Sequence, residues 1–356
     1  MKVWMFLKNL NLTNFRNYSA LFVDFDNRPT VLVGNNAAGK SNILEAIYLL
    51  STTKSQRVET EDELIRQGEE FLRVEGFIDE PETALMVLIN KPTAEVSFRK
   101  RVLVNGISRR VVDFIGNLPA VIFYPSDINM VTGPPSLRRW HLDLGLAQID
   151  PQYKRDLTLY EQFLTARNRV LKAVREGKAR LDELDYWTNE LVNKGKSISQ
   201  KRKVLFEFIN KLEKPLGEFR FEYKQSEISL ERLQETNGRE IAAAATLIGP
   251  HRDDFVVMLE GRHLSHFGSR GEQRTATLAF KLAQLEYMAK ILGKRPILLL
   301  DDVFSELDGE HRAHVVEVVG KQQTIIATVE LENIPKEFLD QARILRVEDE
   351  IVHESS

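Results

Sequence analysis

The 356-residue sequence predicts an α/β protein in which a mixed sheet and an antiparallel β subdomain are interrupted by an inserted helical lobe. Three observations support this fold class. The first hundred residues alternate short β-rich runs with turn signals. Residues 151–214 change to helical spacing, and after residue 217 apolar runs alternate again with helical segments. We therefore expect three segments, 1–150, 151–216 and 217–356.

The β-rich runs of the first segment are short and end at turn-forming residues. Asn105-Gly106 supplies two positive-φ positions of a tight hairpin turn, which indicates antiparallel neighbours. The predicted strands are Val3–Leu12, Ala20–Asp26, Thr30–Val33, Phe71–Ile78, Ala84–Ile89, Ala94–Val104, Ile107–Val112 and Ala120–Tyr124. Most of them form an antiparallel meander.

The middle segment is predicted to be helical. Its apolar residues, from Leu157 to Leu212, recur at three- and four-residue spacing, with Gly177 and Gly195 expected as interruptions. No apolar heptad runs for three or four repeats, so the lobe is not a coiled coil. A hinge at Pro215-Leu216-Gly217 returns the chain to the third segment.

The third segment regains α/β character after a strand near Glu218–Lys224 and a polar stretch to Glu240. Its predicted elements are a strand at Phe255–Leu259, a helix at Gly271–Leu292, a buried strand at Ile297–Leu300, a helix at Asp308–Val319, a strand at Thr324–Ala327, and a strand at Arg343–Val347 that closes the sheet.

Composition excludes several classes of protein. The chain is 43% hydrophobic and 28% charged and contains no apolar run long enough to span a bilayer. The N-terminal residues lack the apolar core of a secretory signal. The chain has no cysteine, so disulfides and thiolate metal sites are impossible, and its histidines show no metal-ligand spacing. These features favour a cytoplasmic protein without zinc.

A phosphate-binding loop lies between the predicted strand Thr30–Val33 and a helix that begins near Ser41. Backbone N–H groups of such a loop surround phosphates, Lys40 reaches the β and γ oxygens, and the Ser41 hydroxyl ligates Mg²⁺. The loop matches G-x-x-x-x-G-K-[ST] and consists of Gly34, Asn35, Asn36, Ala37, Ala38, Gly39, Lys40 and Ser41. It predicts ATP as the ligand, with Mg²⁺.

A phosphate-binding loop needs a second strand that ends in a carboxylate to hold the metal ion. The run Ile297–Leu300 is followed directly by Asp301 and Asp302. We expect Asp301 to contact Mg²⁺ through water and Asp302 to polarise the attacking water.

Two further segments have the order and spacing of an ABC-type ATPase head. Ser269, Gly271 and Glu272 open a helix about thirty residues before the acidic strand and resemble the ABC signature, which binds the γ-phosphate held by a second molecule. Ser305-Glu306-Leu307-Asp308 resembles the D-loop of the same class. The resemblance implies ATP buried between two protomers, and hence an ATP-dependent homodimer.

The segment Leu10–Tyr18 resembles the opening strand and turn of the SMC-like branch of ABC ATPases. Three further segments are similar to the RecF family, namely Gly133–Asp143, Leu247–Asp254 and Gly268–Thr275. The resemblance covers nearly the whole chain. One position departs from the family pattern: Ser126, in Tyr124-Pro125-Ser126-Asp127, stands where the family commonly has Glu. Thr328 stands where transporter-type ABC proteins have a switch histidine, which the RecF-like branch also lacks, so it separates the chain from transporters.

The resemblance implies a cytoplasmic bacterial protein of DNA replication and repair. Such a protein binds DNA at junctions of single and double strands and acts with RecO and RecR to load RecA onto gapped DNA. A weak, DNA-stimulated ATPase serves as its switch.

Several residues keep two interpretations. Arg57 either reaches toward phosphate or is a solvated surface residue, and Arg138 and Arg139 either contact DNA or form ion pairs. The motif His251, Arg252, Asp253 and Asp254 has no derived chemical role, and packing and ion pairing explain it equally well.

DNA contact is expected on the middle segment, which carries roughly +6 in a chain of net charge −3. A solvated helical face explains these basic residues about as well. They are Lys154, Arg155, Arg167, Arg169, Lys172, Arg175, Lys178, Arg180, Lys194, Lys196, Lys201, Arg202 and Lys203.

Two other functions fit parts of the sequence. A chromosome-organising SMC-type head would need hundreds of residues of heptads, which are absent. A small-molecule kinase would use the phosphate loop without dimerisation, but it has no need of a signature or a D-loop.

Overall fold

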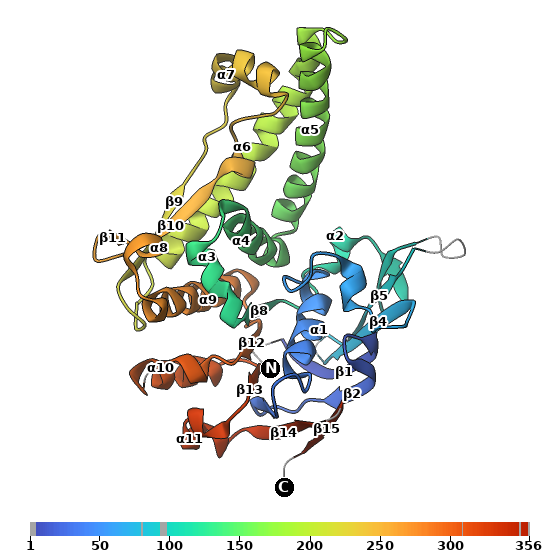
Figure 1. The fold of residues 1–356 in the computed structure, drawn as a ribbon, viewed down its shortest axis with the longest axis vertical. Coiled ribbons are helices and arrows are strands. Elements are labelled where there is room, and N and C mark those ends of the chain that lie inside the picture. The colour runs from blue at the N-terminus through green and yellow to red at the C-terminus, as the bar shows by residue number, and fades with distance from the viewer. Residues whose placement is uncertain (1–4, 80, 93–97, 308, 349, 355–356) are drawn as a thin grey trace. The chain divides into compact units, whose positions relative to one another are not determined.

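The structure is a computed structural model that describes residues 5–79, 81–92, 98–307, 309–348 and 350–354. It divides into two units, the first made of Met1–Asp127 and Thr277–Ser356 and the second of Ile128–Ala276 (Figure 1). In the second unit the helices of the predicted lobe share contacts with flanking strands. The division at residues 150 and 216 stays a prediction about folding units.

The first unit contains an antiparallel sheet with the strand order β2-β1-β4-β5-β6-β7. Side chains along β4 and β5 alternate between buried and more exposed positions, as expected for a sheet with one face on the core. The strands are β1 (Leu7–Phe15), β2 (Tyr18–Asp24), β4 (Phe71–Ile78), β5 (Thr83–Asn90), β6 (Lys100–Val104) and β7 (Ile107–Arg109). The predicted antiparallel meander is confirmed.

Three predicted strand boundaries of this sheet have no counterpart among the described strands. The predicted starts at Val3 and Ala94 lie outside the described residues. The predicted strand to Val112 is wrong beyond Arg109, because helix α2 (Val111–Phe114) begins there and buries Phe114.

A mixed sheet forms the other half of the first unit, with the order β15-β14-β3-β13-β12-β8. Every residue of β3, β8, β12 and β13 is buried, which explains why their sequences are mostly apolar. The strands are β3 (Thr30–Val33), β8 (Ala120–Phe123), β12 (Ile297–Asp301), β13 (Thr324–Thr328), β14 (Arg343–Glu348) and β15 (Ile351–Glu354). β14 does not close the sheet as predicted, because β15 pairs with it antiparallel.

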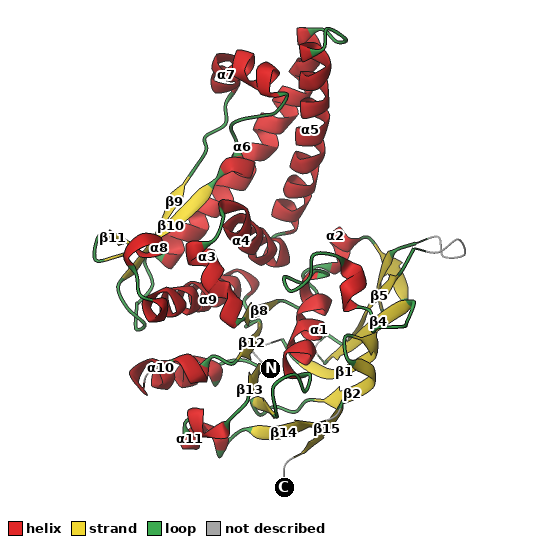
Figure 2. Ribbon diagram, viewed as in Figure 1, coloured by secondary structure: helices red, strands yellow, loops and turns green. Residues whose placement is uncertain are grey.

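Helix α1 (Lys40–Thr52) lies between the two sheets, with contacts to β1, β4 and β5 on one side and to β8, β12 and β13 on the other (Figure 2). Two-sided packing explains why nearly all of its residues are buried, including Lys40 and Glu45. The phosphate loop enters this helix, so its position is fixed by both sheets.

The second unit is built around a pair of long helices, α5 (Pro151–Arg175) and α6 (Asp185–Ile209). Gly177 separates them in a left-handed conformation, as predicted. Gly195 does not interrupt a helix. It lies inside α6, where a Cβ atom would meet Ile228 at 2.9 Å, so glycine there permits close packing.

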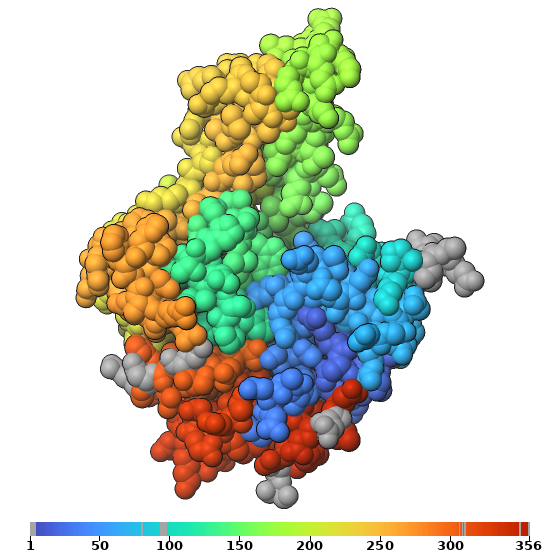
Figure 3. All heavy atoms as spheres, in the orientation of Figure 1, coloured from blue at the N-terminus to red at the C-terminus, as the bar shows by residue number. Residues whose placement is uncertain are grey.

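Shorter elements surround this helix pair. Helix α7 (Leu230–Ala243), which falls in the predicted polar stretch, begins at a Ser229 cap and packs against α5 (Figure 3). The others are α3 (Asn129–Thr132), α4 (Pro135–Ile149), α8 (Leu264–Phe267), and a small sheet of β9 (Phe219–Lys224), β10 (Asp254–Leu259) and β11 (Arg262–His263).

Helix α9 (Arg270–Leu292) begins in the second unit and continues into the first. The first unit also contains α10 (Gly309–Val319), whose predicted first residue Asp308 lies outside the described residues, and α11 (Lys336–Leu339). Across the described ranges, no helix has the length and apolarity needed to cross a membrane.

Candidate nucleotide-binding site

The loop from Gly34 to Gly39 joins the end of β3 to the start of α1 and depends on two glycines. A Cβ atom at Gly34 would lie 2.3 Å from the Val347 carbonyl oxygen. Gly39 has φ +110°, and a Cβ atom there would lie 2.3 Å from the Tyr18 hydroxyl. Ala37 also has positive φ. Positive φ at Ala37 and Gly39, with Ala38 between them, alternates with negative φ along the loop. Such an alternation turns successive backbone N–H groups to one side and forms an anion-binding concavity, called a nest.

The Lys40 ammonium group is bound to the backbone of the loop that precedes it. It donates hydrogen bonds to the carbonyl oxygens of Gly34 and Asn35, both at 2.8 Å. Burial lowers the pKa of Lys40, and the carboxylates of Asp301 and Asp302 oppose that shift. A phosphate oxygen would therefore supply the negative charge that the buried ammonium group lacks.

Ser41 and Asp301 meet from different elements. The Ser41 hydroxyl, at the start of α1, donates a 2.9 Å hydrogen bond to Oδ1 of Asp301, at the end of β12. Burial raises the pKa of Asp301, and the Ser41 hydrogen bond works against that rise. This hydrogen bond places the Asp301 carboxylate beside the hydroxyl that is expected to ligate Mg²⁺, a position from which Asp301 can contact the ion through a coordinated water molecule.

Asp302 follows directly and has a distinctive backbone. Its φ is +50°, and its N–H donates to the Ala327 carbonyl oxygen on β13 at 2.9 Å. The Ser305 hydroxyl donates to the Asp302 carbonyl oxygen. These contacts fix the turn after β12 while leaving the Asp302 side chain at the pocket.

These residues line one pocket of about 440 Å³ in the first unit. The loop residues Gly34, Asn35 and Ala38 shape it without lining it. The lining residues are Asn36, Ala37, Gly39, Lys40, Ser41, Asn42, Arg57, Pro125, Asp301, Asp302, Ala327, Thr328 and Val329. Its ammonium group, anion nest, hydroxyl and carboxylates fit a triphosphate with a divalent cation.

Arg57 lies on the rim of this pocket, with its side chain one-third exposed. It donates to Oδ1 of Asn42 at 3.0 Å and pairs with Glu45 at 3.2 Å. Arg57 is thus an exposed residue with side-chain contacts to α1, and its reach toward phosphate stays a prediction.

In the loop Tyr124–Asp127, the residue that makes buried polar contacts is Asp127 and not Ser126. Ser126 is exposed. Asp127 is buried, accepts hydrogen bonds from Gln56 Nε2 at 2.9 Å and from the Tyr124 N–H at 3.0 Å, and pairs with Lys281 on α9 at 3.4 Å. This contact ties the loop after α1 to the later part of α9 within the first unit.

The predicted signature begins α9 in the second unit. Ser269 and Glu272 form a reciprocal capping box: the Ser269 N–H donates to the Glu272 carboxylate at 2.7 Å, and the Glu272 N–H donates to the Ser269 hydroxyl oxygen at 3.2 Å. The Ser269 backbone N–H and hydroxyl lower the pKa of Glu272. Ser269 and Gly271 are exposed. The last residue of the predicted D-loop, Asp308, lies outside the described residues.

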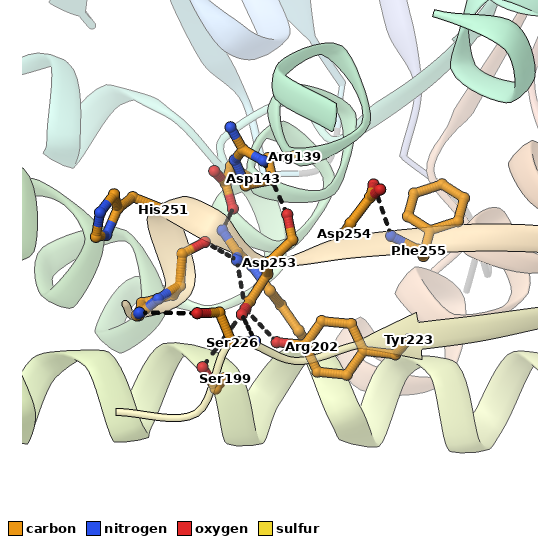
Figure 4. A network of polar contacts seen from close by, with 12 residues as sticks. Arg139, Asp143, Ser199, Arg202, Tyr223, Ser226, His251, Asp253, Asp254 and Phe255 are labelled. Atoms are coloured by element: carbon orange, nitrogen blue, oxygen red, sulfur yellow. Dashed lines mark hydrogen bonds and ion pairs between the residues drawn. The ribbon is translucent and has the colours of Figure 1, made fainter. Parts of the chain in front are cut away.

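A buried polar network surrounds Asp253, the third residue of the motif His251–Asp254 (Figure 4). Arg202 donates to the Pro250 carbonyl at 2.7 Å, to Asp253 at 2.8 Å and to Asp143 at 2.7 Å. Asp253 also accepts from the Ser226 N–H at 2.7 Å and from the Tyr223 hydroxyl. The motif therefore holds α4, α6, β9 and β10 together.

The neighbouring residues follow the same pattern. Arg138 pairs with Asp254, so the contacts favour its ion-pair interpretation, whereas Arg139 donates to the backbone carbonyl oxygen of Asp253 at 2.8 Å. His251 lies between the Tyr160 hydroxyl and the Thr246 carbonyl oxygen, and burial lowers its pKa to about 4.

Three basic residues that were predicted to face DNA are buried in the structure. Arg167 is buried in contact with Glu240 and Thr246, Arg202 is buried as described, and Lys154 is also buried. Predicting them at a surface was wrong because helical spacing alone does not show which face of α5 or α6 packs inward. The exposed members include Arg169, Lys172, Arg175, Lys196 and Lys203.

Sequence reasoning missed Glu45 and Asp127. Glu45 had a visible signal, since it stands alone among apolar residues of a helix predicted to be buried, where a charge needs a partner. Asp127 had none, because its partner Lys281 lies far along the chain.

The sheets, the phosphate loop and the acidic strand define an ATPase head of the ABC class. A family model described as RecF/RecN/SMC N terminal domain matches residues 6–351. The DNA replication and repair protein RecF of Bacillus cytotoxicus is 36% identical, covering 96% of this chain and 97% of that protein. RecF of Oceanobacillus iheyensis is 35% identical over 98% of this chain and all of its own length.

Solved structures that resemble this chain include members of the same family. A structure described as the recombination mediator protein RecF-ATP in the RecFOR pathway is 28% identical, with a TM-score of 0.88, covering 100% of this chain and 99% of that one. An Smc head domain from Pyrococcus furiosus, 16% identical with a TM-score of 0.53, shares the fold. The chain belongs to the RecF family.

Proposed function

We propose that the chain is an ATP-dependent DNA-binding protein of recombinational repair and replication-fork maintenance. The observation that carries the proposal is the contact of Ser41 with Asp301 in a pocket that also holds Lys40. That geometry suits a nucleotide, and the RecF relatives, one of them solved with ATP, direct the proposal to DNA repair.

We assign each predicted residue a role. The loop Gly34–Ser41 and Lys40 hold the phosphates, Arg57 reaches them from the rim, and Ser41 and Asp301 hold Mg²⁺, which neutralises charge on the phosphates when bound. Asp302 polarises the attacking water.

The signature residues Ser269, Gly271 and Glu272 bind the γ-phosphate in a second copy of the chain. Support comes from the start of α9, where Ser269 and Gly271 are exposed and the capping box of Ser269 with Glu272 orders the first turn. ATP would thus close a homodimer, and slow, DNA-stimulated hydrolysis would reopen it.

The partners follow from the family. We expect double-stranded and gapped or junction DNA, contacted through its backbone, together with RecO and RecR and indirectly RecA, in the bacterial cytoplasm. The support for RecO and RecR is that the solved RecF relatives are described within the RecFOR pathway.

A DNA-binding titration tests this function. Gapped, duplex and single-stranded DNA are each titrated with and without ATP at one fixed salt concentration. We expect the tightest binding to gapped DNA with ATP. Equal affinity in all six conditions would exclude an ATP-gated DNA-binding protein.

A further inference from the structure

Glu45 is a buried carboxylate that two arginines share. It lies on α1 with its side chain 2% exposed. Arg16 donates to it through Nε at 2.9 Å and Nη2 at 2.7 Å, Arg57 donates through Nη1 at 3.2 Å, and the Ser55 hydroxyl donates as well. Two positive groups thus converge on one carboxylate, and one of them, Arg57, lines the nucleotide pocket.

The two arginines are used differently. Arg16 sits in a left-handed turn with φ +55°, its N–H donates to the Leu64 carbonyl oxygen, and its remaining Nη1 donates to the Glu63 carbonyl oxygen at 3.1 Å. Its two parallel bonds to Glu45 fix the plane of that carboxylate. Arg16 is therefore the fixed support of the cluster.

Arg57 is held by one nitrogen only. Both of its side-chain hydrogen bonds, to Asn42 and to Glu45, use Nη1. Within the part of the chain that the structure describes, no acceptor is found for its Nε or Nη2. The guanidinium group also lies 5.7 Å from the centroid of the Tyr124 ring, and Arg57 lines the pocket.

We propose that Glu45 is a positioning residue that aims Arg57 at the phosphates of the bound nucleotide. This inference rests on the proposed ATP binding. By holding Nη1, Glu45 leaves Nε and Nη2 for phosphate oxygens, and a side chain that is already oriented loses less conformational entropy when the ligand binds.

An electrostatic role of Glu45 and a positioning role of Glu45 predict opposite effects of Glu45→Gln on ATP affinity. This substitution removes a negative charge close to the phosphate site, so a purely electrostatic role predicts tighter ATP binding. If Glu45 acts by orienting Arg57, the same substitution weakens ATP binding.

Titration of the full chain with a fluorescent ATP analogue tests the proposal. Binding by the wild type tests the pocket itself. We expect Glu45→Gln and Arg57→Ala each to raise Kd by about tenfold, and the double variant to exceed Arg57→Ala by no more than about threefold, because both act through one group. Unchanged or tighter binding by Glu45→Gln, or fully additive losses, would overturn the positioning role while leaving the proposed function intact.

A matched control and a second variant keep the test independent of folding. Glu286→Gln makes the same change in an Arg–Glu pair, with Arg295, that does not line the pocket, and it should bind as the wild type does. Arg57→Lys keeps the charge but loses the guanidinium geometry. We expect it to bind about as weakly as Arg57→Ala, and wild-type affinity would refute the inference.

Discussion

At the scale of single residues, the pocket holds an ammonium group and a carboxylate whose charges are weakened by burial. The pKa of Lys40 is lowered and that of Asp301 is raised, although each opposes the shift of the other. Sites that destabilise their own charges in this way are typical of ligand binding. A metal-bound triphosphate would offer a positive charge to Asp301 and negative charge to Lys40.

Asp302 gives the sharpest prediction at this scale. Asp302→Asn should leave ATP affinity within about threefold and slow hydrolysis by about a hundredfold or more, because a carboxylate that polarises water is lost. Single-turnover hydrolysis and nucleotide titration measure the two quantities. Asp340→Asn, an exposed aspartate outside the pocket, is the control. Wild-type turnover by Asp302→Asn would show that another group activates the water.

His251 predicts a pH dependence of stability. Its folded pKa of about 4 lies below the ordinary value of 6.5, so the unfolded chain binds a proton more readily. The free energy of unfolding should therefore fall as pH falls from about 6.5 toward 4, by about 2 kcal/mol between pH 7 and pH 5 from this group. Urea unfolding at both pH values measures it. His251→Gln should lose that share of the pH dependence, and an unchanged slope would contradict the assignment.

At the scale of elements, the helix that carries the predicted signature is capped by the residues proposed to meet the partner's phosphate. Ser269→Ala removes both the cap and the hydroxyl, and we expect about 1 kcal/mol lower stability together with weaker ATP-dependent dimerisation. Ser269→Asn retains a good cap, so it should keep the stability and still lose dimerisation. Unfolding and sedimentation separate the two effects. Normal dimerisation by Ser269→Asn would remove the signature role of Ser269.

Elements with strong local patterns could be predicted from the sequence. The buried strand Ile297–Leu300 and the helix after Gly271 carry uniform or periodic apolar residues, and the structure confirms both. Helix α7 was missed because its polar composition hid the Ser229 cap, and β15 because its residues are mostly exposed.

Part of the site could be predicted from the sequence and part could not. The phosphate loop and Asp301 are recognisable from the spacing of their residues, and in the structure they meet through the hydrogen bond of Ser41 with Asp301. Glu45 with Arg16, and Arg202 with Asp253, could not be paired from the sequence, because each pair joins residues that meet only through tertiary packing. Their roles depend on which helix face turns inward.

At the scale of the whole molecule, each unit holds one part of the proposed composite site. The first unit contains the phosphate loop and the acidic strand, and the second contains Ser269 at the start of α9. The central claim is that ATP joins these parts between two copies of the chain.

Sedimentation of Asp302→Asn with and without ATP and Mg²⁺ tests that claim most directly, since blocked hydrolysis preserves the closed state. We predict one chain per particle without nucleotide and two with saturating ATP, with Ser269→Asn in the same background remaining a single chain. A single chain per particle at saturating, demonstrably bound ATP would contradict the account.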